Sequence, residues 1–461
     1  MSAAAPNRTE RPPPWVLLRQ VFANRRMAAL LLLGFSSGLP LALTAGTLQA
    51  WLTVEGVSLK AIGFATLIGQ AYVFKFAWAP GMDRIQPPSV LRALGRRRGW
   101  LLLMQALLAA SLAAIAIVGI PAPTATSPWP GLDRLAGALG MAEGDMRLLP
   151  VGILAVAVAF FSASQDIVID AYRTDLLPPE ERGAGAAVAV LGYRLAMLVS
   201  GGLALWLAAD YLGWRGLYAL MAGLMVVLML ATLFAPPTPG NIKAPRSLAE
   251  AVVEPAREFF ARRGAVALLV AVVLYKLGDA FAGALSTTFL IRGAGYSPAE
   301  VGLVYKTMGI ATTIVGALLG GAWLARLGLW RSLVWFGLVQ GLSNLAYWAL
   351  AVLPSNLALM AAAVGIENFT GGMGTAAFVA FLSALCDARF SATQFALLSA
   401  LSAVGRVYVG PATGFLVEAW GWPHFYLLTV VVSAPGVLMV VWLRRVIETQ
   451  DRIHAPRQAA G

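Results

Sequence analysis

The stretch VGILAVAVAFFSASQDIVIDAYRTDLLPPEERG, residues 151–183, carries two aspartates at the end of a long apolar run. In an α-helix, Asp166 and Asp170 lie one turn apart and share one face with Ser162 and Arg173. A charge at mid-bilayer costs about 3 kcal/mol on insertion scales, so a charged residue kept there is a candidate for function. The stretch therefore predicts a membrane helix whose polar face is turned toward the protein interior.

The rest of the chain has the same apolar character. Of its 461 residues, 59% are hydrophobic and 12% are charged, and the mean hydropathy is +0.75. A soluble domain has no core large enough to bury this apolar fraction, and continuous apolar blocks exclude a β-barrel. We expect an all-α polytopic membrane protein embedded in the lipid bilayer. Its twelve spans are predicted near residues 27–48, 59–82, 100–120, 150–172, 184–208, 216–235, 265–291, 299–324, 330–352, 357–385, 392–417 and 423–443.

Positive charges gather in alternate loops between these spans. The N-terminal arm, the loop between the second and third spans, the central loop and the C-terminal tail are rich in arginine, and the opposite loops are not. By the positive-inside rule, both termini are cytoplasmic. The net charge of +12 thus reflects membrane topology, and no nucleic-acid partner is expected.

A polar segment at residues 236–264 separates two sets of six spans. It begins at a proline-rich helix breaker, and SLAEAVVEPAREFFARR, residues 247–263, has the periodicity of an amphipathic helix on the membrane surface. The expected organisation is a cytoplasmic arm (1–26), a six-helix bundle (27–235), this central cytoplasmic loop (236–264), a second six-helix bundle (265–445) and a cytoplasmic tail (446–461).

Two loops show that the halves repeat each other weakly. PGMDRIQPPSVLRALGRRRG, residues 80–99, and GGAWLARLGLWRS, residues 320–332, place glycines and arginines comparably. Parallel six-span repeats describe the major facilitator fold, and the first loop resembles the gating motif of that superfamily. The resemblance implies a gate made by Asp83, Arg84, Arg97 and Arg98. The alternative is a solvated helix end that follows the positive-inside rule.

Nine charged residues lie inside the predicted spans and away from their ends. This set has both signs, so it suits a substrate bearing both charges, and it also suits proton coupling through Asp166, Asp170, Asp279 or Glu367. Because the fourth and fifth spans are sequential, Arg194 is expected to hold Asp166, leaving Asp170 to exchange a proton; a permanent pair joining the two helices is the alternative. The nine are Lys75, Asp166, Asp170, Arg194, Lys276, Asp279, Lys306, Glu367 and Arg406.

Other chemistries lack the necessary residues. His424 and His454 are the only histidines and lie at or beyond the membrane edges, and there is no Walker motif. We therefore expect no metal, no cofactor and no enzymatic activity. In the first span, Gly38 and Pro40 predict a kink facing a cavity, with Gln49 behind it; close helix packing is the alternative for the glycine.

Several long stretches resemble the AmpG muropeptide permeases of Gram-negative inner membranes. They include residues 34–52, 161–187, 273–281, 367–386 and 390–411. The resemblance implies proton-driven import, by alternating access, of GlcNAc-1,6-anhydro-MurNAc-peptides for peptidoglycan recycling. It also implies indirect support of β-lactamase induction, and hence of antibiotic resistance. We expect a monomer.

The chemistry of such a substrate suggests the binding residues. Arg194, Lys276 and Arg406 suit carboxylates, Asp279 or Glu367 suits an amine, and tyrosines and amides suit the sugars. The QDI-x-x-D motif also looks like that of acetyl-CoA transporters, so an acyl-CoA or another amphoteric anion is an alternative substrate, and a sensor that does not transport is an alternative function. The full expected set is Gly38, Gln49, Gln165, Tyr193, Arg194, Lys276, Asp279, Glu367, Asn368, Arg406 and Tyr408.

The arginine bias makes a prediction about topology. In a Cys386→Ala background, a cysteine placed in residues 121–149 should react with a membrane-impermeant reagent in whole cells, and one placed in 236–264 should not. Labelling of the central loop from outside would reverse the orientation and the expected direction of transport.

Overall fold

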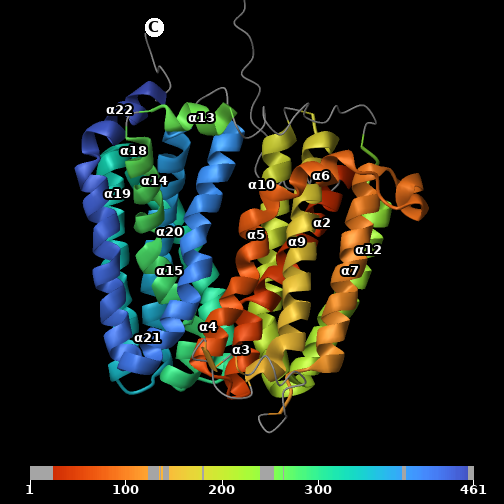
Figure 1. The fold of residues 1–461 in the computed structure, drawn as a ribbon, viewed down its shortest axis with the longest axis horizontal. Coiled ribbons are helices and arrows are strands. Elements are labelled where there is room, and N and C mark those ends of the chain that lie inside the picture. Colours follow the sequence, from red (N-terminus) through yellow and green to blue (C-terminus); the bar gives the residue numbers. More distant parts are fainter. Residues whose placement is uncertain are drawn as a thin grey trace, which may run out of the picture.

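The computed structural model describes residues 24–122, 134, 137–138, 145–178, 181–238, 254–262, 264–386 and 391–454. For residues 83, 84, 182–184, 254–256, 306, 391–393, 396 and 450–454 it describes the backbone alone. These segments are almost entirely helical, and Figure 1 shows them as two bundles side by side. The all-α architecture predicted from hydropathy is thus confirmed. Most of the N-terminal arm and part of the tail lie outside the described residues.

The first bundle is built from the N-terminal half. Its long helices are α2 (Arg25–Thr44), α7 (Arg96–Val118), α9 (Leu149–Leu176), α10 (Arg182–Met197) and α12 (Gly213–Phe234). Helix α3 (Gly46–Val54) continues α2, and residues 59–84 form the short helices α4 (Leu59–Ala65), α5 (Gln70–Phe74) and α6 (Ala79–Arg84), joined by 3₁₀ turns. Two π-helical segments and α11 (Ala204–Leu207) lie between α10 and α12.

The second bundle follows α13 (Glu254–Phe260), which lies across its end in Figure 1. The Phe259 side chain of α13 is buried in the core of this bundle. The bundle contains α14 (Ala265–Tyr275), α15 (Leu277–Ala284), α16 (Ser286–Thr288), α17 (Pro298–Glu300), α18 (Gly309–Leu327), α19 (Leu329–Val352), α20 (Leu357–Ala384) and α21 (Ser391–Trp442). Helix α22 (Arg444–His454) ends the described chain.

Within the described residues, eight helical segments are long and apolar enough to cross a membrane. Two of them, Gly185–Phe234 and Leu397–Trp442, each cover two predicted spans and contain a glycine of positive φ, Gly213 or Gly421. Predicted spans 59–82 and 357–385, which correspond to α4–α6 and α20, are not among the eight. A polytopic membrane protein is confirmed, and the number of twelve spans stays a prediction.

Glycines bring α2 and α10 into backbone contact. A Cβ at Gly192 would lie 2.0 Å from the Leu31 carbonyl oxygen, and one at Gly38 would lie 2.4 Å from that of Tyr193. Such close approach is typical of membrane helices, where small residues allow extensive van der Waals packing. Gly38 therefore lies in a helix–helix contact.

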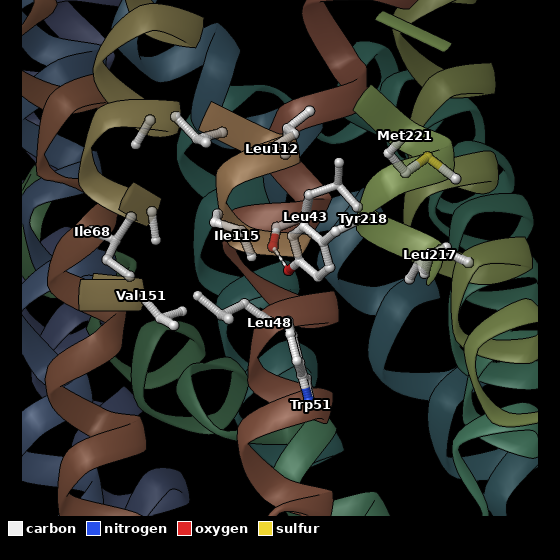
Figure 2. Close-up of a cluster of buried hydrophobic side chains, with 14 of the residues drawn as sticks. Leu43, Leu48, Trp51, Ile68, Leu112, Ile115, Val151, Leu217, Tyr218 and Met221 are labelled. Atoms are coloured by element: carbon white, nitrogen blue, oxygen red, sulfur yellow. Dashed lines mark hydrogen bonds between the residues drawn. The ribbon is translucent and has the colours of Figure 1, made fainter. Parts of the chain in front are cut away.

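The break in the first span falls after Pro40. Helix α2 ends at Thr44, where Ala45 leaves the helical conformation with φ −110° and ψ −106°. Such a break leaves backbone carbonyls that need other partners. In Figure 2 the buried Tyr218 hydroxyl donates a 2.6 Å hydrogen bond to the carbonyl of Leu43, inside an apolar cluster that includes Trp51 and Leu217. The apolar core thus stabilises the bend.

The two bundles are joined at one end of the molecule. The Arg292 guanidinium donates to the carbonyls of Thr53, at 2.6 and 3.1 Å, and Val57, at 2.7 Å, next to the C-terminal end of α3. Lys60 and Glu418 form a 3.0 Å ion pair in the same region. In Figure 1 the bundles meet near α3 and α4 and diverge toward α13 and α22. Contacts across the halves thus close the α3–α4 end.

Glycine packing makes a prediction about stability. Gly192→Ala should lower the free energy of unfolding, because the new methyl group meets a backbone carbonyl and the overpacking costs about 1–3 kcal/mol. Gly152→Ala is the matched control, because a Cβ there meets nothing within 4 Å. Alanine gains up to about 1 kcal/mol of helix propensity at either site. Thermal unfolding in detergent measures both, and an unchanged midpoint for Gly192→Ala contradicts the packing argument.

Candidate functional site

A cavity of about 1220 Å³ lies between the two bundles. Its walls come from α2, α3, the segment α4–α6, α9 and α10 on one side, and from α15, α16 and α21 on the other. Because its lining draws polar and charged side chains from both bundles, it is the candidate binding site. Its charged lining residues are Lys75, Asp166, Asp170, Asp279 and Arg406, and its polar lining includes Thr44, Gln49, Tyr72, Tyr193, Ser286 and Tyr305.

The two aspartates of α9 have different surroundings. Asp166 is half-buried and accepts a 2.5 Å hydrogen bond from the Ser37 hydroxyl of α2. The Asp170 side chain is 59% exposed and pairs with Arg173, one helical turn away, at 3.2 Å. One carboxylate is thus held by a neutral hydroxyl and the other by a cation.

The expected pairing of Arg194 with these aspartates is not present in the described part of the chain. Arg194 is exposed and does not line the cavity. Although α9 and α10 are consecutive, the face of α10 that lines the cavity carries the preceding residue, Tyr193, instead. Helix α10 packs mainly against α2 and barely against α9, so the adjacency expected from chain order is not found, and the rotation of α10 turns Arg194 away from the cavity.

The second bundle contributes a local ion pair. Helix α14 ends at Tyr275, and Lys276 connects it to α15, so that Lys276 and Asp279 pair at 3.0 Å. Gln340 of α19 also donates to the Asp279 carboxylate, and the Lys276 ammonium lies 5.6 Å from the centre of the Phe378 ring. Asp279 faces the cavity with its negative charge already compensated, and Lys276 is not among the lining residues.

Glu367 and Asn368 of α20 lie outside the cavity lining. Glu367 accepts a 2.7 Å hydrogen bond from the Asn368 amide, and Asn368 accepts another at 3.3 Å from the hydroxyl of Thr313. The nearby Tyr347 hydroxyl is buried without a hydrogen-bond partner within the described residues, and Glu367 acts on it electrostatically. These residues form a polar group behind the cavity wall.

The remaining predicted binding residues are dispersed. Gln49 lines the cavity and donates a 2.8 Å hydrogen bond to the Ala284 carbonyl of the other bundle. Gln165 is fully buried and donates to Ser36 at 3.1 Å, so it helps to hold α9 against α2. Tyr408 is exposed and donates to Gln70 at 3.3 Å.

The two predicted gating arginines whose side chains are described bind within their own bundle. Arg97 pairs with Asp175 at 2.7 Å, with both side chains buried. Arg98 donates to the carbonyls of Thr232, at 3.1 Å, and Leu233. They thus hold the start of α7 against the ends of α9 and α12. The side chains of Asp83 and Arg84 lie outside the described part of the structure.

Several residues with roles at the site were missed by the sequence. Lys75 is expected from the sequence as an intramembrane charge but not as a binding residue, and Arg292 lies just beyond the predicted span 265–291. Ser37 and Gln340 gave no signal, because a serine or a glutamine in an apolar helix does not reveal which neighbour it faces.

Comparison with known proteins places this architecture in a family. Residues 92–366 and 268–461 match the model of the Major Facilitator Superfamily. The chain is 56% identical to the anhydromuropeptide permease of Escherichia coli K12 over 429 residues, which cover 93% of this chain and 82% of that protein. The chain belongs to the AmpG-type permeases of the major facilitator superfamily. The family resemblance inferred from the sequence is confirmed.

Further similarities agree with this placement. The putative transporter AmpG 4 of Rickettsia felis is 30% identical, over 93% of this chain and 99% of that protein. The crystal structure of a bacterial homologue of the human lysosomal transporter Spinster, inward-facing and unoccupied, aligns with a TM-score of 0.68, covering 92% of this chain and 97% of that one, at 16% identity. A D-xylose–proton symporter aligns with a TM-score of 0.62, covering 90% and 96% of the chains, also at 16% identity. Both structures share the fold of this AmpG-type permease.

The Lys276–Asp279 pair makes a prediction for this AmpG-type permease. Lys276→Met should lower the free energy of unfolding by about 1–3 kcal/mol, because it leaves the Asp279 carboxylate with a neutral partner. Adding Asp279→Asn should restore most of that loss, because the asparagine oxygen still accepts from Gln340. Thermal midpoints of the two single variants and of the double variant, measured in detergent, give the coupling free energy between Lys276 and Asp279. If the losses of the two single variants simply add in the double variant, the ion pair does not stabilise the fold.

Proposed function

We propose that this chain imports GlcNAc-1,6-anhydro-MurNAc-peptides from the periplasm to the cytoplasm across the inner membrane of a Gram-negative bacterium. Transport is driven by protons and uses alternating access of the cavity between the two bundles. The imported muropeptides enter peptidoglycan recycling, and their flux indirectly supports β-lactamase induction. The chain acts as a monomer, with both termini in the cytoplasm, and catalyses no reaction.

The cavity is the observation that carries this proposal. Drug-sized ligands occupy pockets of about 300–1,000 Å³, and this cavity, at about 1220 Å³, suits a larger molecule. A disaccharide-peptide presents hydroxyls, amides, carboxylates and an amine, which match lining residues of the same kinds and of both charges. With the arginine-rich side cytoplasmic, the bundles diverge toward the cytoplasm, so the described arrangement is inward-facing.

The geometry supports Asp166 as the proton site. A hydroxyl both donates and accepts, so Ser37 can bind Asp166 in its ionised and in its protonated form. Asp170 is fixed by the Arg173 cation, which favours the ionised form alone. This reverses the assignment expected from the sequence, where Asp166 was to be held by Arg194. Glu367, which is bound by a neutral amide, is the next candidate.

Uptake into proteoliposomes tests the proposed function. With a pH gradient, acid outside, the purified protein should accumulate labelled anhydrodisaccharide-tripeptide, and collapse of the gradient should stop accumulation. An acyl-CoA should not compete for uptake. Binding without accumulation indicates a sensor, and competition by the acyl-CoA indicates the other substrate class; either result overturns the proposal.

The two aspartates provide a matched pair of variants. Asp166→Asn should keep exchange of substrate between the two sides and lose accumulation driven by the pH gradient, because the exchanging proton has no site. Asp170→Asn should retain both activities within a few-fold, because its carboxylate is already compensated. If Asp166→Asn still concentrates substrate, the proton site lies elsewhere, with Glu367→Gln as the next variant.

A further inference from the structure

The seventh predicted span is interrupted beside the cavity. Helix α15 ends at Ala284, and Leu285 leaves the helical conformation with φ −117° and ψ 26° before α16 begins at Ser286. In an uninterrupted helix the N–H of Thr288 would donate to the carbonyl of Ala284, four residues earlier. Thr288 is fully buried, so its N–H needs a hydrogen-bond partner other than water.

Gln49, on α3 of the other bundle, takes both halves of that hydrogen bond. Its amide nitrogen donates to the Ala284 carbonyl at 2.8 Å, and its amide oxygen accepts from the Thr288 N–H at a longer 3.4 Å. A carbonyl only accepts and an N–H only donates, so these partners fix the orientation of the amide. Insertion of a side chain into the i→i−4 ladder is one of the causes of a sharp break in a helix.

The side chain at the break is also held by the first bundle. Leu285 is buried in the apolar cluster that contains Leu43 and Leu48, and the other buried members of this cluster all come from the first bundle. The hydroxyls of Thr53 and Thr288 form a further 2.8 Å hydrogen bond across the same contact. The non-helical conformation of Leu285 is thus maintained by groups on the other side of the bundle contact.

The break in the first span has a partner within its own bundle instead. Ala45 interrupts that span after α2, and the nearby Leu43 carbonyl accepts a hydrogen bond from Tyr218 of α12. These groups move together when the bundles separate at the α3–α4 end, so this break persists. The break at Leu285 loses in the same movement the partners that the first bundle supplies.

We propose that opening of the α3–α4 end withdraws Gln49 and allows the Thr288 N–H to bond to the Ala284 carbonyl, so that the seventh span becomes continuous in the opposite state. Gln49 is then a positioning residue that exchanges places with a backbone hydrogen bond, and not a ligand of the substrate. This rests on the alternating access of the proposed function and adds to it a movement within one span. The new backbone bond offsets part of the free energy lost when the contacts at the closed end are broken.

Hydrogen exchange at the Thr288 amide tests the proposal on purified protein. Gln49→Leu keeps the approximate size of the side chain and removes its hydrogen bonds. The backbone bond can then form in either state, so the Thr288 amide should exchange no faster than in wild type. If the break is permanent, the variant leaves a buried N–H without an acceptor, and a rise in its exchange rate of about fivefold or more overturns the proposal. Rates are taken relative to those of α19, so that a general loss of stability does not count.

Uptake kinetics separate a positioning residue from a ligand of the substrate. Gln49→Leu removes a contact from the closed end, so the KM for substrate that enters at that end should fall about two- to tenfold. A raised KM identifies Gln49 as a substrate ligand and overturns the proposal. Thr53→Val is the matched control, because it removes a hydrogen bond from the same bundle contact and leaves the Gln49 amide in place. It should lower the KM by a similar factor, with no faster exchange at the Thr288 amide.

Failure of this inference and failure of the proposed function give different results. Hydrogen exchange is measured without transport, so faster exchange at Thr288 in Gln49→Leu overturns the inference while uptake by wild type stands. Wild type that does not accumulate labelled muropeptide overturns the proposed function, whatever the exchange rates are.

Discussion

A charged group inside a bilayer costs free energy unless it meets water, an opposite charge or a hydrogen bond, and this constraint organises the interior of the permease. Each described intramembrane charge that faces the cavity or the bundle contact satisfies it in a different way. Asp166 uses the Ser37 hydroxyl, Asp279 uses Lys276 together with Gln340, and Arg292 uses backbone carbonyls of the other bundle. Lys75 and Arg406 rely on the cavity itself. These charges therefore lie where a partner group or the cavity is available to them.

Close packing and polar contacts have complementary roles in the two bundles. Glycines such as Gly192 bring helices of one bundle so near that their backbones touch, which makes each bundle resistant to deformation. Between the bundles, by contrast, the closed end combines further backbone approach, as at Gly63 against the Gly410 carbonyl, with hydrogen bonds and one partly exposed ion pair. Contacts of the latter kind can be exchanged for others at small cost. Rigid bundles joined by exchangeable contacts are what alternating access requires.

The sequence was sufficient for those properties that depend on hydropathy and local spacing. It predicted the helical membrane class and the family. The three-residue spacing of Lys276 and Asp279 makes their ion pair a local contact. The sequence did not predict that Arg194 is turned from the cavity while Tyr193 faces it, because a rotation of about 100° per residue decides which of two neighbours lines a wall. Nor did it predict that Arg292 reaches Thr53 and Val57, since this contact joins segments far apart in the chain. The predicted kink after Pro40 was correct in kind, although the break itself lies at Ala45.

The contact of Arg292 with the end of α3 has a consequence for the unliganded carrier. Its three hydrogen bonds exist in the described arrangement and must be given up before the α3–α4 end can open. In the absence of ligand, these hydrogen bonds therefore favour the conformation that is closed at that end. A ligand that arrives at that end binds only the minority of molecules that have opened. Its apparent affinity is therefore reduced by the fraction that is open, about tenfold for each 1.4 kcal/mol by which the closed state is favoured. Arg292, which does not line the cavity, thus sets how much ligand is needed on the side of the membrane that the α3–α4 end faces.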